Sequence, residues 1–259
     1  CASGMEAITA AKQKLAAGEG EMFLVGGTES MSNFPLMMGP QLVRFFTRLN
    51  KARTLPKRLR TLLSFRPSAM KPRIAIMEGL TDPTTGLMMG NTAELVAQRF
   101  GIDREAMDAY ALQSHQRAAA AQLSDRFGRE LVPMIAPPTF HNAVKADDGI
   151  RMGQTIEALQ KLRPVFDRHE GDVTVGNSCQ VTDGATALLV TSLSKAKKLG
   201  LEPLAIIRST ATAALSPSTM GLGPVHATPI ALDRAGLTLD DIDVAELNEA
   251  FAAQVLGCI

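Results

Sequence analysis

The sequence predicts an α/β protein in which strands and helices alternate at both ends of the chain, around a long irregular middle. Short apolar runs bounded by glycine indicate buried strands, and apolar residues spaced three and four apart indicate helices. Frequent prolines break this periodicity in the middle, which indicates an inserted subdomain. The length of 259 residues suits one large domain or two ordinary ones.

The first predicted elements are a helix and a strand. Apolar side chains recur at helical spacing over residues 1–18, and Gly18 lies just past the helix end. The run EMFLV at 21–25 predicts a buried strand, which Gly26 and Gly27 should close with a turn.

The later elements continue the alternation. Two strong helical patterns lie between Thr92 and Phe127, and Asp103 is a suitable N-cap for the second. An irregular, proline-rich stretch follows over residues 130–172. The elements beyond it are, in order, strands over 172–175 and 185–191, a short helix over 192–199, a β-rich run over 204–213, a helix over 226–235 that ends at Gly236, and a strand over 242–247.

The composition excludes several classes of protein. Hydrophobic residues make up 46% and charged residues 20% of the chain, which excludes a disordered protein. The 27 basic and 26 acidic residues leave a net charge of +1, which argues against a nucleic-acid partner. Three cysteines cannot build a disulfide framework, and no apolar run reaches the roughly 18 residues of a membrane-spanning helix. We expect a soluble protein without a metal site, in the cytoplasm or, in a eukaryote, the mitochondrial matrix.

Both ends of the chain predict a piece of a longer protein. The chain opens at Cys1 without an initiator Met or a signal-peptide pattern, and it stops at Ile259 within a helical pattern.

Cys1 is the first candidate for chemistry. It lies at the N-terminus of the first predicted helix, where backbone N–H groups and the helix dipole favour a thiolate. Ser3 and Gly4 leave space for a substrate to approach the sulfur. A small buried thiol would fit the same position, so Cys1 alone leaves both interpretations open.

Seven further motifs follow Cys1 in order. They are Gly26-Gly27-Thr28-Glu29-Ser30-Met31-Ser32, Met89-Gly90-Asn91-Thr92-Ala93-Glu94, Ser114-His115-Gln116-Arg117-Ala118, Lys161-Leu162-Arg163-Pro164-Val165-Phe166-Asp167, Gly176-Asn177-Ser178 with Thr182-Asp183-Gly184-Ala185, Gly221-Leu222-Gly223-Pro224, and Asn248-Glu249-Ala250-Phe251-Ala252-Ala253-Gln254. This ordered set resembles the thiolase family over nearly the whole chain. The fifth and seventh motifs are the most specific.

The resemblance implies acyl transfer between 3-ketoacyl-CoA and CoA, as in fatty-acid β-oxidation. Cys1 matches the family's nucleophile, which attacks the 3-keto carbon and holds the acyl group as a thioester. Acetyl-CoA leaves as an enolate that is protonated, and CoA then takes the acyl group from the thioester. Asn248 matches the residue that fixes a water in the family's oxyanion hole. A helix N-cap is an equally good role for Asn248 on the sequence alone, and both roles can coexist.

Two family elements are expected beyond Asn248 and are not in this sequence. One is the His of a Gly-His-Pro segment, and the other is a second catalytic Cys in a Cys-x-Gly-Gly segment. The four histidines of this chain match neither element, and they are His115, His141, His169 and His226. Cys258 is expected to be a structural thiol. We therefore expect these 259 residues alone to be inactive.

The resemblance also implies CoA contacts, with CoA and acyl-CoA as substrates and no permanently bound cofactor. Arg151 matches a residue near the nucleotide end of CoA, although a solvated loop arginine is the simpler interpretation. Cys179 stands where many relatives carry a Ser near the pantetheine. Met88 and Met89 match residues that flank the acyl and pantetheine tunnel, and they would equally serve as core filling.

The implied fold has five layers, αβαβα, formed by two similar halves, and only part of it is present. Residues 1–30 and 171–200 would belong to the N-terminal half, 31–170 to an inserted loop subdomain that covers CoA, and 201–259 to the start of the C-terminal half. Relatives are homodimers or dimers of dimers.

A basic segment lies within the insertion. Residues 31–77 contain ten basic residues and no acidic one, and apolar residues are interleaved with them. Such a stretch over 41–73 suits an anionic membrane surface, an acidic partner or the phosphates of CoA. The insertion resembles that of the β-subunit of long-chain β-oxidation complexes, which implies a partner subunit.

Three alternative functions stay open. Within the family, the alternative is a biosynthetic acetyl-CoA acetyltransferase. Cys1 could also be an N-terminal nucleophile of an amidohydrolase, with its own α-amino group as the base. The third alternative is a non-catalytic CoA-binding module, which would bind acyl-CoA without acyl transfer to Cys1.

Overall fold

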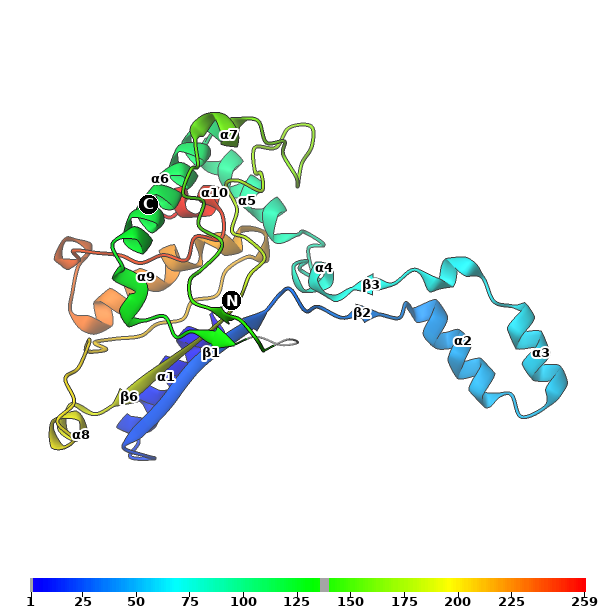
Figure 1. Cartoon of the computed structure of the whole chain (residues 1–259), viewed down its shortest axis with the longest axis horizontal. Coiled ribbons are helices and arrows are strands. Elements are labelled where there is room, and N and C mark those ends of the chain that lie inside the picture. The colour runs from blue at the N-terminus through cyan, green and yellow to red at the C-terminus, as the bar shows by residue number, and fades with distance from the viewer. Residues whose placement is uncertain (1, 136–139) are drawn as a thin grey trace.

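The structure is a computed structural model, and it describes residues 2–135 and 140–259. Three parts can be followed in Figure 1: a two-stranded ribbon with a helix beside it, a body of helices, and an arm that extends far from both. Cys1 lies outside the described residues.

The ribbon pairs two segments that are distant in the sequence. Strands β1 (Met22–Ser30) and β6 (Asp183–Thr191) are antiparallel, with Met22 opposite Thr191. Helix α1 (Ser3–Ala16) packs against them, and Gly18 follows it with a positive φ of 74°, which confirms the predicted helix end.

The predicted turn at Gly26 and Gly27 is wrong, because both residues lie inside β1. A Cβ atom at Gly26 would collide with the carbonyl oxygen of Thr186 on the paired strand. Glycine therefore permits close approach of the two backbones here.

The arm lies between residues 36 and 74. Strands β2 (Leu36–Met37) and β3 (Arg73–Ile74) pair antiparallel at its base, as a short stalk. Helices α2 (Pro40–Lys51) and α3 (Leu55–Leu63) form a hairpin at its far end, and a 3-10 turn (Pro67–Met70) leads back (Figure 1). Prolines start these helices because their fixed φ suits the first helical turn.

The body is built on two long helices, as the sequence predicted. Helix α5 (Met89–Phe100) and helix α6 (Arg104–Leu123) are separated by a short turn, and the Asp103 carboxylate accepts the Ala106 N–H at 2.8 Å as the predicted N-cap. Helix α10 (Ala252–Leu256) packs on both. The buried core lies between them and comprises Ala93, Ala97, Met107, Val173, Phe251, Ala252 and Ala253.

The remaining elements surround this body. They are α4 (Ala75–Gly79), α7 (Ile156–Gln160), α8 (Leu193–Lys198), α9 (Gly223–Ala235), the strand pair β4 (Met134–Ile135) and β5 (Ala143–Val144), and 3-10 turns at Arg126–Arg129, Pro217–Leu222 and Leu239–Asp241. The predicted helices over 192–199 and 226–235 are confirmed as α8 and α9, and Gly236 ends α9 with a φ of 67°. Within the described residues, no helix is long and apolar enough to cross a membrane.

Three predicted strands are wrong. Val173 and Thr174 are fully buried and Val175 is exposed, and the N–H groups of Asp172 and Val173 donate to a side chain instead of to a neighbouring strand. Residues 204–213 are non-helical, and side chains reach their carbonyls: Lys12 donates to Arg208, and Arg234 to Thr210. No described segment pairs with 242–247. A strand needs a partner for its ladder, and apolar composition alone does not supply one.

Candidate functional site

The loop over residues 172–180 is the centre of the candidate site. The buried Glu94 carboxylate on α5 accepts the N–H of Asp172 at 3.0 Å and the N–H of Val173 at 2.9 Å. Two charge-assisted hydrogen bonds thus replace the strand ladder that the apolar sequence suggested.

A second buried carboxylate holds the next part of this loop. Asp108 on α6 is fully buried and forms an ion pair with Arg104 at 2.7 Å. Its other oxygen accepts the side-chain amide of Asn177 at 3.0 Å, and the Asn177 carbonyl oxygen of the side chain accepts the Thr174 N–H at 2.8 Å. Arg104 also donates to the main-chain carbonyls of Leu159 and Leu162. The Arg104–Asp108 ion pair and its hydrogen bonds therefore hold the loop to α6 at Asn177.

The segment 248–252 lies against this loop. The Cys179 N–H donates to the Ala250 carbonyl at 2.8 Å, and the Ala252 N–H donates to the Asn177 carbonyl at 2.9 Å. Phe251 packs edge-on against Phe166, with ring centroids 6.0 Å apart. The two most specific sequence motifs are therefore in direct contact.

Glu249 in this segment is bound from α6. The Tyr110 hydroxyl donates to one carboxylate oxygen at 2.6 Å, and the Ser114 hydroxyl donates to the other at 2.5 Å. Partial burial, and then the Glu249 carboxylate, raise the pKa of Tyr110 to about 12. Tyr110 therefore remains a hydrogen-bond donor throughout the neutral pH range.

His115, next on α6, reaches a third segment. Its Nδ1 accepts the backbone N–H of Arg151 at 3.3 Å. Partial burial and the nearby Arg151 charge lower the pKa of His115 below its usual value, although Glu249 opposes this shift. The neutral ring then carries its proton on Nε2.

A small cavity of about 190 Å³ lies where these segments meet. It is lined by Tyr110, Ala111, Ser114, His115, Gly176, Asn177, Ser178, Cys179, Gln180, Glu249 and Ala252. Cys179 is exposed as a residue, yet neighbouring atoms remove water from its sulfur and raise the pKa of its thiol. A thiol at this place is therefore a neutral contact group, unlike an activated nucleophile.

Of the predicted site residues, Cys179 lines this cavity, and Asn248, Arg151, Met88 and Met89 do not. Asn248 is exposed and is not a helix N-cap, because Phe251 occupies that position in α10. Arg151 is also exposed, beside His115. Met88 and Met89 are half-buried at the start of α5, and Met89 packs on the core. No group of three metal-ligating side chains occurs within 2–135 and 140–259.

The sequence did not predict that Tyr110 and Ser114 both bind Glu249. Tyr110 and Ser114 are four residues apart on α6, so their hydroxyls lie on one helix face. That spacing was a usable signal for two donors converging on one acceptor. The sequence indicated Glu249 only as a member of the motif that begins at Asn248.

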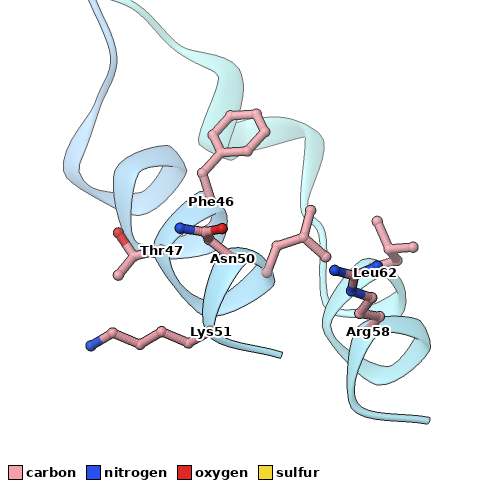
Figure 2. A pocket seen from close by; sticks show the side chains of 7 residues that line it. Phe46, Thr47, Asn50, Lys51, Arg58 and Leu62 are labelled. Atoms are coloured by element: carbon pink, nitrogen blue, oxygen red, sulfur yellow. The ribbon is translucent and has the colours of Figure 1, made fainter. Parts of the chain in front are cut away.

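The arm carries two larger hollows between α2 and α3. One, of about 730 Å³, is lined by Phe46, Leu49, Leu62 and more polar neighbours, and Figure 2 shows side chains from both helices around it. The other, of about 420 Å³, is lined by four basic side chains, namely Arg48, Lys51, Lys57 and Arg60, with Ala52, Thr61 and Ser64. Helices α2 and α3 lie at the far end of the arm, away from the body that contains the candidate site (Figure 1).

Comparison with known families identifies the class of protein to which this fold and these motifs belong. The thiolase N-terminal domain model matches residues 1–194, and the thiolase C-terminal domain model matches residues 201–259. The chain therefore belongs to the thiolase family, as the sequence motifs implied.

The curated relatives carry a more specific name than the family models do, and they are longer than this chain. A 3-ketoacyl-CoA thiolase of Yersinia enterocolitica is 42% identical over 258 residues, which cover 99% of this chain and 58% of the relative. A 3-ketoacyl-CoA thiolase of Klebsiella pneumoniae is 41% identical over the same length. The chain thus spans 58% of the length of these curated relatives.

Two solved structures show the same fold in part. Human mitochondrial 3-ketoacyl-CoA thiolase in complex with CoA is 35% identical, with a TM-score of 0.82, and this chain covers 59% of it. The acetyl-CoA acetyltransferase of Bacillus anthracis is 33% identical, with a TM-score of 0.85, and 60% of it is covered. Both comparisons cover 100% of this chain.

Proposed function

We propose that this chain is the nucleophile-bearing part of a thiolase that cleaves 3-ketoacyl-CoA with CoA into acetyl-CoA and a shortened acyl-CoA. The contact between the loop 172–180 and the segment 248–252 beside a small cavity carries the proposal. Cys1 is the proposed nucleophile, and Asn248 is the proposed holder of the oxyanion-hole water. The 3-ketoacyl-CoA thiolase relatives favour the degradative direction over the biosynthetic one.

We assign CoA to the surface around the cavity. Cys179 lines the cavity and would contact the pantetheine, while Arg151 would meet the nucleotide end. Met88 and Met89 would flank the acyl chain. A CoA complex of a relative at 35% identity supports this assignment, and no permanently bound cofactor is proposed.

We further propose the five-layer fold with the division 1–30, 31–170, 171–200 and 201–259. The pairing of β1 with β6 across the intervening residues supports it, since both strands belong to the proposed N-terminal half. A homodimer or dimer of dimers in the cytoplasm completes the proposal.

The first experiment is intact mass of the protein, as its gene encodes it, before and after incubation with acetyl-CoA. One acetyl group should be gained, and Cys1→Ala should abolish the gain. Cys258→Ala is the matched control and should keep it, because partial burial raises the pKa of the Cys258 thiol. Binding of acetyl-CoA without acetylation would favour the non-catalytic module instead. Activity that is lost on blocking the α-amino group would favour the amidohydrolase.

We also propose that the arm binds an anionic membrane surface. Residues 31–77 contain ten basic residues and no acidic one, and large apolar side chains are exposed among them, such as Leu55 at 84% and Leu63 at 80%. Apolar and cationic groups together are what a lipid interface with anionic headgroups recognises. The hollow lined by four basic side chains would accept a headgroup phosphate.

Vesicle flotation tests this surface. The protein should float with phosphatidylcholine vesicles that contain phosphatidylserine and not with pure phosphatidylcholine, and added salt should weaken binding. Lys57→Glu with Arg60→Glu on α3 should abolish flotation, whereas the exposed pair Arg126→Glu with Arg129→Glu on the body should not. Equal effects of the two pairs would overturn the proposal. Failure to float, with capture of an acidic partner subunit through the arm, would overturn it in favour of that partner.

A further inference from the structure

Glu249 directly follows Asn248, and its carboxylate is held by two side chains of α6. Tyr110 and Ser114 bind the two oxygens of the Glu249 carboxylate at 2.6 and 2.5 Å. Hydrogen bonds to an ionised carboxylate are stronger than neutral ones, and two donors on opposite oxygens fix its rotation. The two hydroxyls of α6 therefore hold the Glu249 side chain in one orientation.

The backbone around Glu249 is fixed as well. The Ala250 N–H donates to the Asn248 carbonyl at 3.0 Å, which closes a tight turn across Glu249. The Ala250 carbonyl in turn accepts the Cys179 N–H at 2.8 Å. Asn248 itself is exposed, so its position depends on this turn more than on packing.

We propose that Tyr110, Ser114 and Glu249 form a positioning triad that places Asn248 for its work in the oxyanion hole. The inference rests on the proposed function of Asn248. The two hydroxyls on α6 hold Glu249, Glu249 holds the turn, and the turn sets where the Asn248 amide lies. A displacement of that amide by a fraction of an ångström weakens the stabilisation of developing charge.

The role differs from ordinary stabilisation of the fold. α6 already holds the loop 172–180 through Asp108, and α10 packs on α6 through buried apolar groups. Loss of the two hydroxyls leaves those contacts intact. The expected defect is therefore in turnover, with little change in substrate binding or melting temperature.

The test is a double-mutant cycle in the protein as its gene encodes it. Tyr110→Phe with Ser114→Ala should lower kcat about tenfold, with KM for CoA changed less than about twofold. The same pair in an Asn248→Ala background should have no further effect on kcat, because the group that the triad positions is gone. Ser114→Thr on its own keeps a hydroxyl and should keep near-normal turnover. Ser124→Ala is the control, because the Ser124 hydroxyl donates to the Ala120 and Ala121 carbonyls of its own helix.

Each outcome decides a separate point. Cys1 acetylation in the unmodified protein tests the proposed function alone. If acetylation occurs but the pair leaves kcat unchanged, the positioning triad is wrong. If the pair lowers kcat equally with and without Asn248, the triad acts elsewhere and the inference also fails. A rise in KM with unchanged kcat would assign these hydroxyls to CoA binding instead.

Discussion

At the scale of single residues, buried charge determines where the loop 172–180 lies. Asp108 is fully buried and satisfied by both Arg104 and Asn177. Asp108→Ala should lower the free energy of unfolding by about 3–5 kcal/mol, because it leaves the Arg104 charge without its partner. Denaturant unfolding measures this loss. Glu78→Ala, which breaks the exposed pair with Arg73, is the control and should cost less than about 1 kcal/mol. Equal losses would contradict the importance of burial.

Tyr110 offers a spectroscopic check on Glu249, because it is the single tyrosine of the sequence. Its pKa is raised to about 12 from 10.0 by partial burial and by Glu249, so the folded state retains a proton that the unfolded state releases in this range. The stability from Tyr110 is thus fully present below pH 10 and is lost as the pH rises toward 12. The phenolate absorbance that Tyr110→Phe removes should titrate near 12, and Glu249→Gln should lower that midpoint. An unchanged midpoint in Glu249→Gln would show that the carboxylate does not act on this hydroxyl.

At the scale of elements, the start of α5 depends on one glycine. A Cβ atom at Gly90 would lie only 2.2 Å from the nearest ring atom of Phe166. Gly90→Ala should therefore destabilise the protein by about 1–3 kcal/mol through overpacking, measured by denaturant unfolding. Gly79→Ala in α4 meets no atom within 4 Å and should change stability by less than about 0.5 kcal/mol. A neutral Gly90→Ala would mean that the Phe166 ring moves aside freely.

The sequence predicted helices better than strands, for a physical reason. Helix signals are local: Asp103 caps α6, and Gly18 and Gly236 end α1 and α9 through positive φ. A strand is defined by a partner distant in the sequence. The run 204–213 has strand composition, yet its carbonyls bind side chains from α1 and α9. Composition reports burial and backbone preference but not pairing.

The sequence predicted only those parts of the candidate site that lie within the family motifs. Cys179 and the segment beginning at Asn248 were identified through family motifs, and the structure brings the two segments together. The contribution of Tyr110 was not predicted, because a hydrogen bond between residues 110 and 249 joins positions 139 apart in the sequence. Cys1 remains a prediction from sequence, outside the described residues.

At the scale of the whole molecule, the ribbon leaves apolar surface uncovered. Leu24 on β1 is 78% exposed, and Leu188 and Leu189 on β6 are exposed as well. Two strands alone rarely hold a stable sheet, and unpaired edges attract other chains. We expect the 259 residues expressed alone to sediment above the monomer mass of 27.6 kDa. Leu24→Lys with Leu189→Lys should reduce this self-association, because it places two charges on the exposed apolar face of the ribbon.

The control for the ribbon is Leu123→Lys, a substitution of an exposed leucine at the end of α6 in the body. It changes charge and exposed apolar area without touching the ribbon. If it reduces association as much as the changes in β1 and β6, the ribbon is not the surface responsible.

The three attachments of α6 also set which insertions and deletions the chain can accept. Asp108, Tyr110 with Ser114, and His115 each bind a different segment from one helix. Each added residue turns the rest of a helix by about 100°, so one insertion before Asp108 would swing all these side chains away together. The arm is joined to the rest of the molecule through the short strand pair β2 and β3, with two residues in each strand. The number of residues in the arm can therefore change without rotating any helix of the body. Related genes should therefore vary in length in the arm and keep the count of residues in α6 constant.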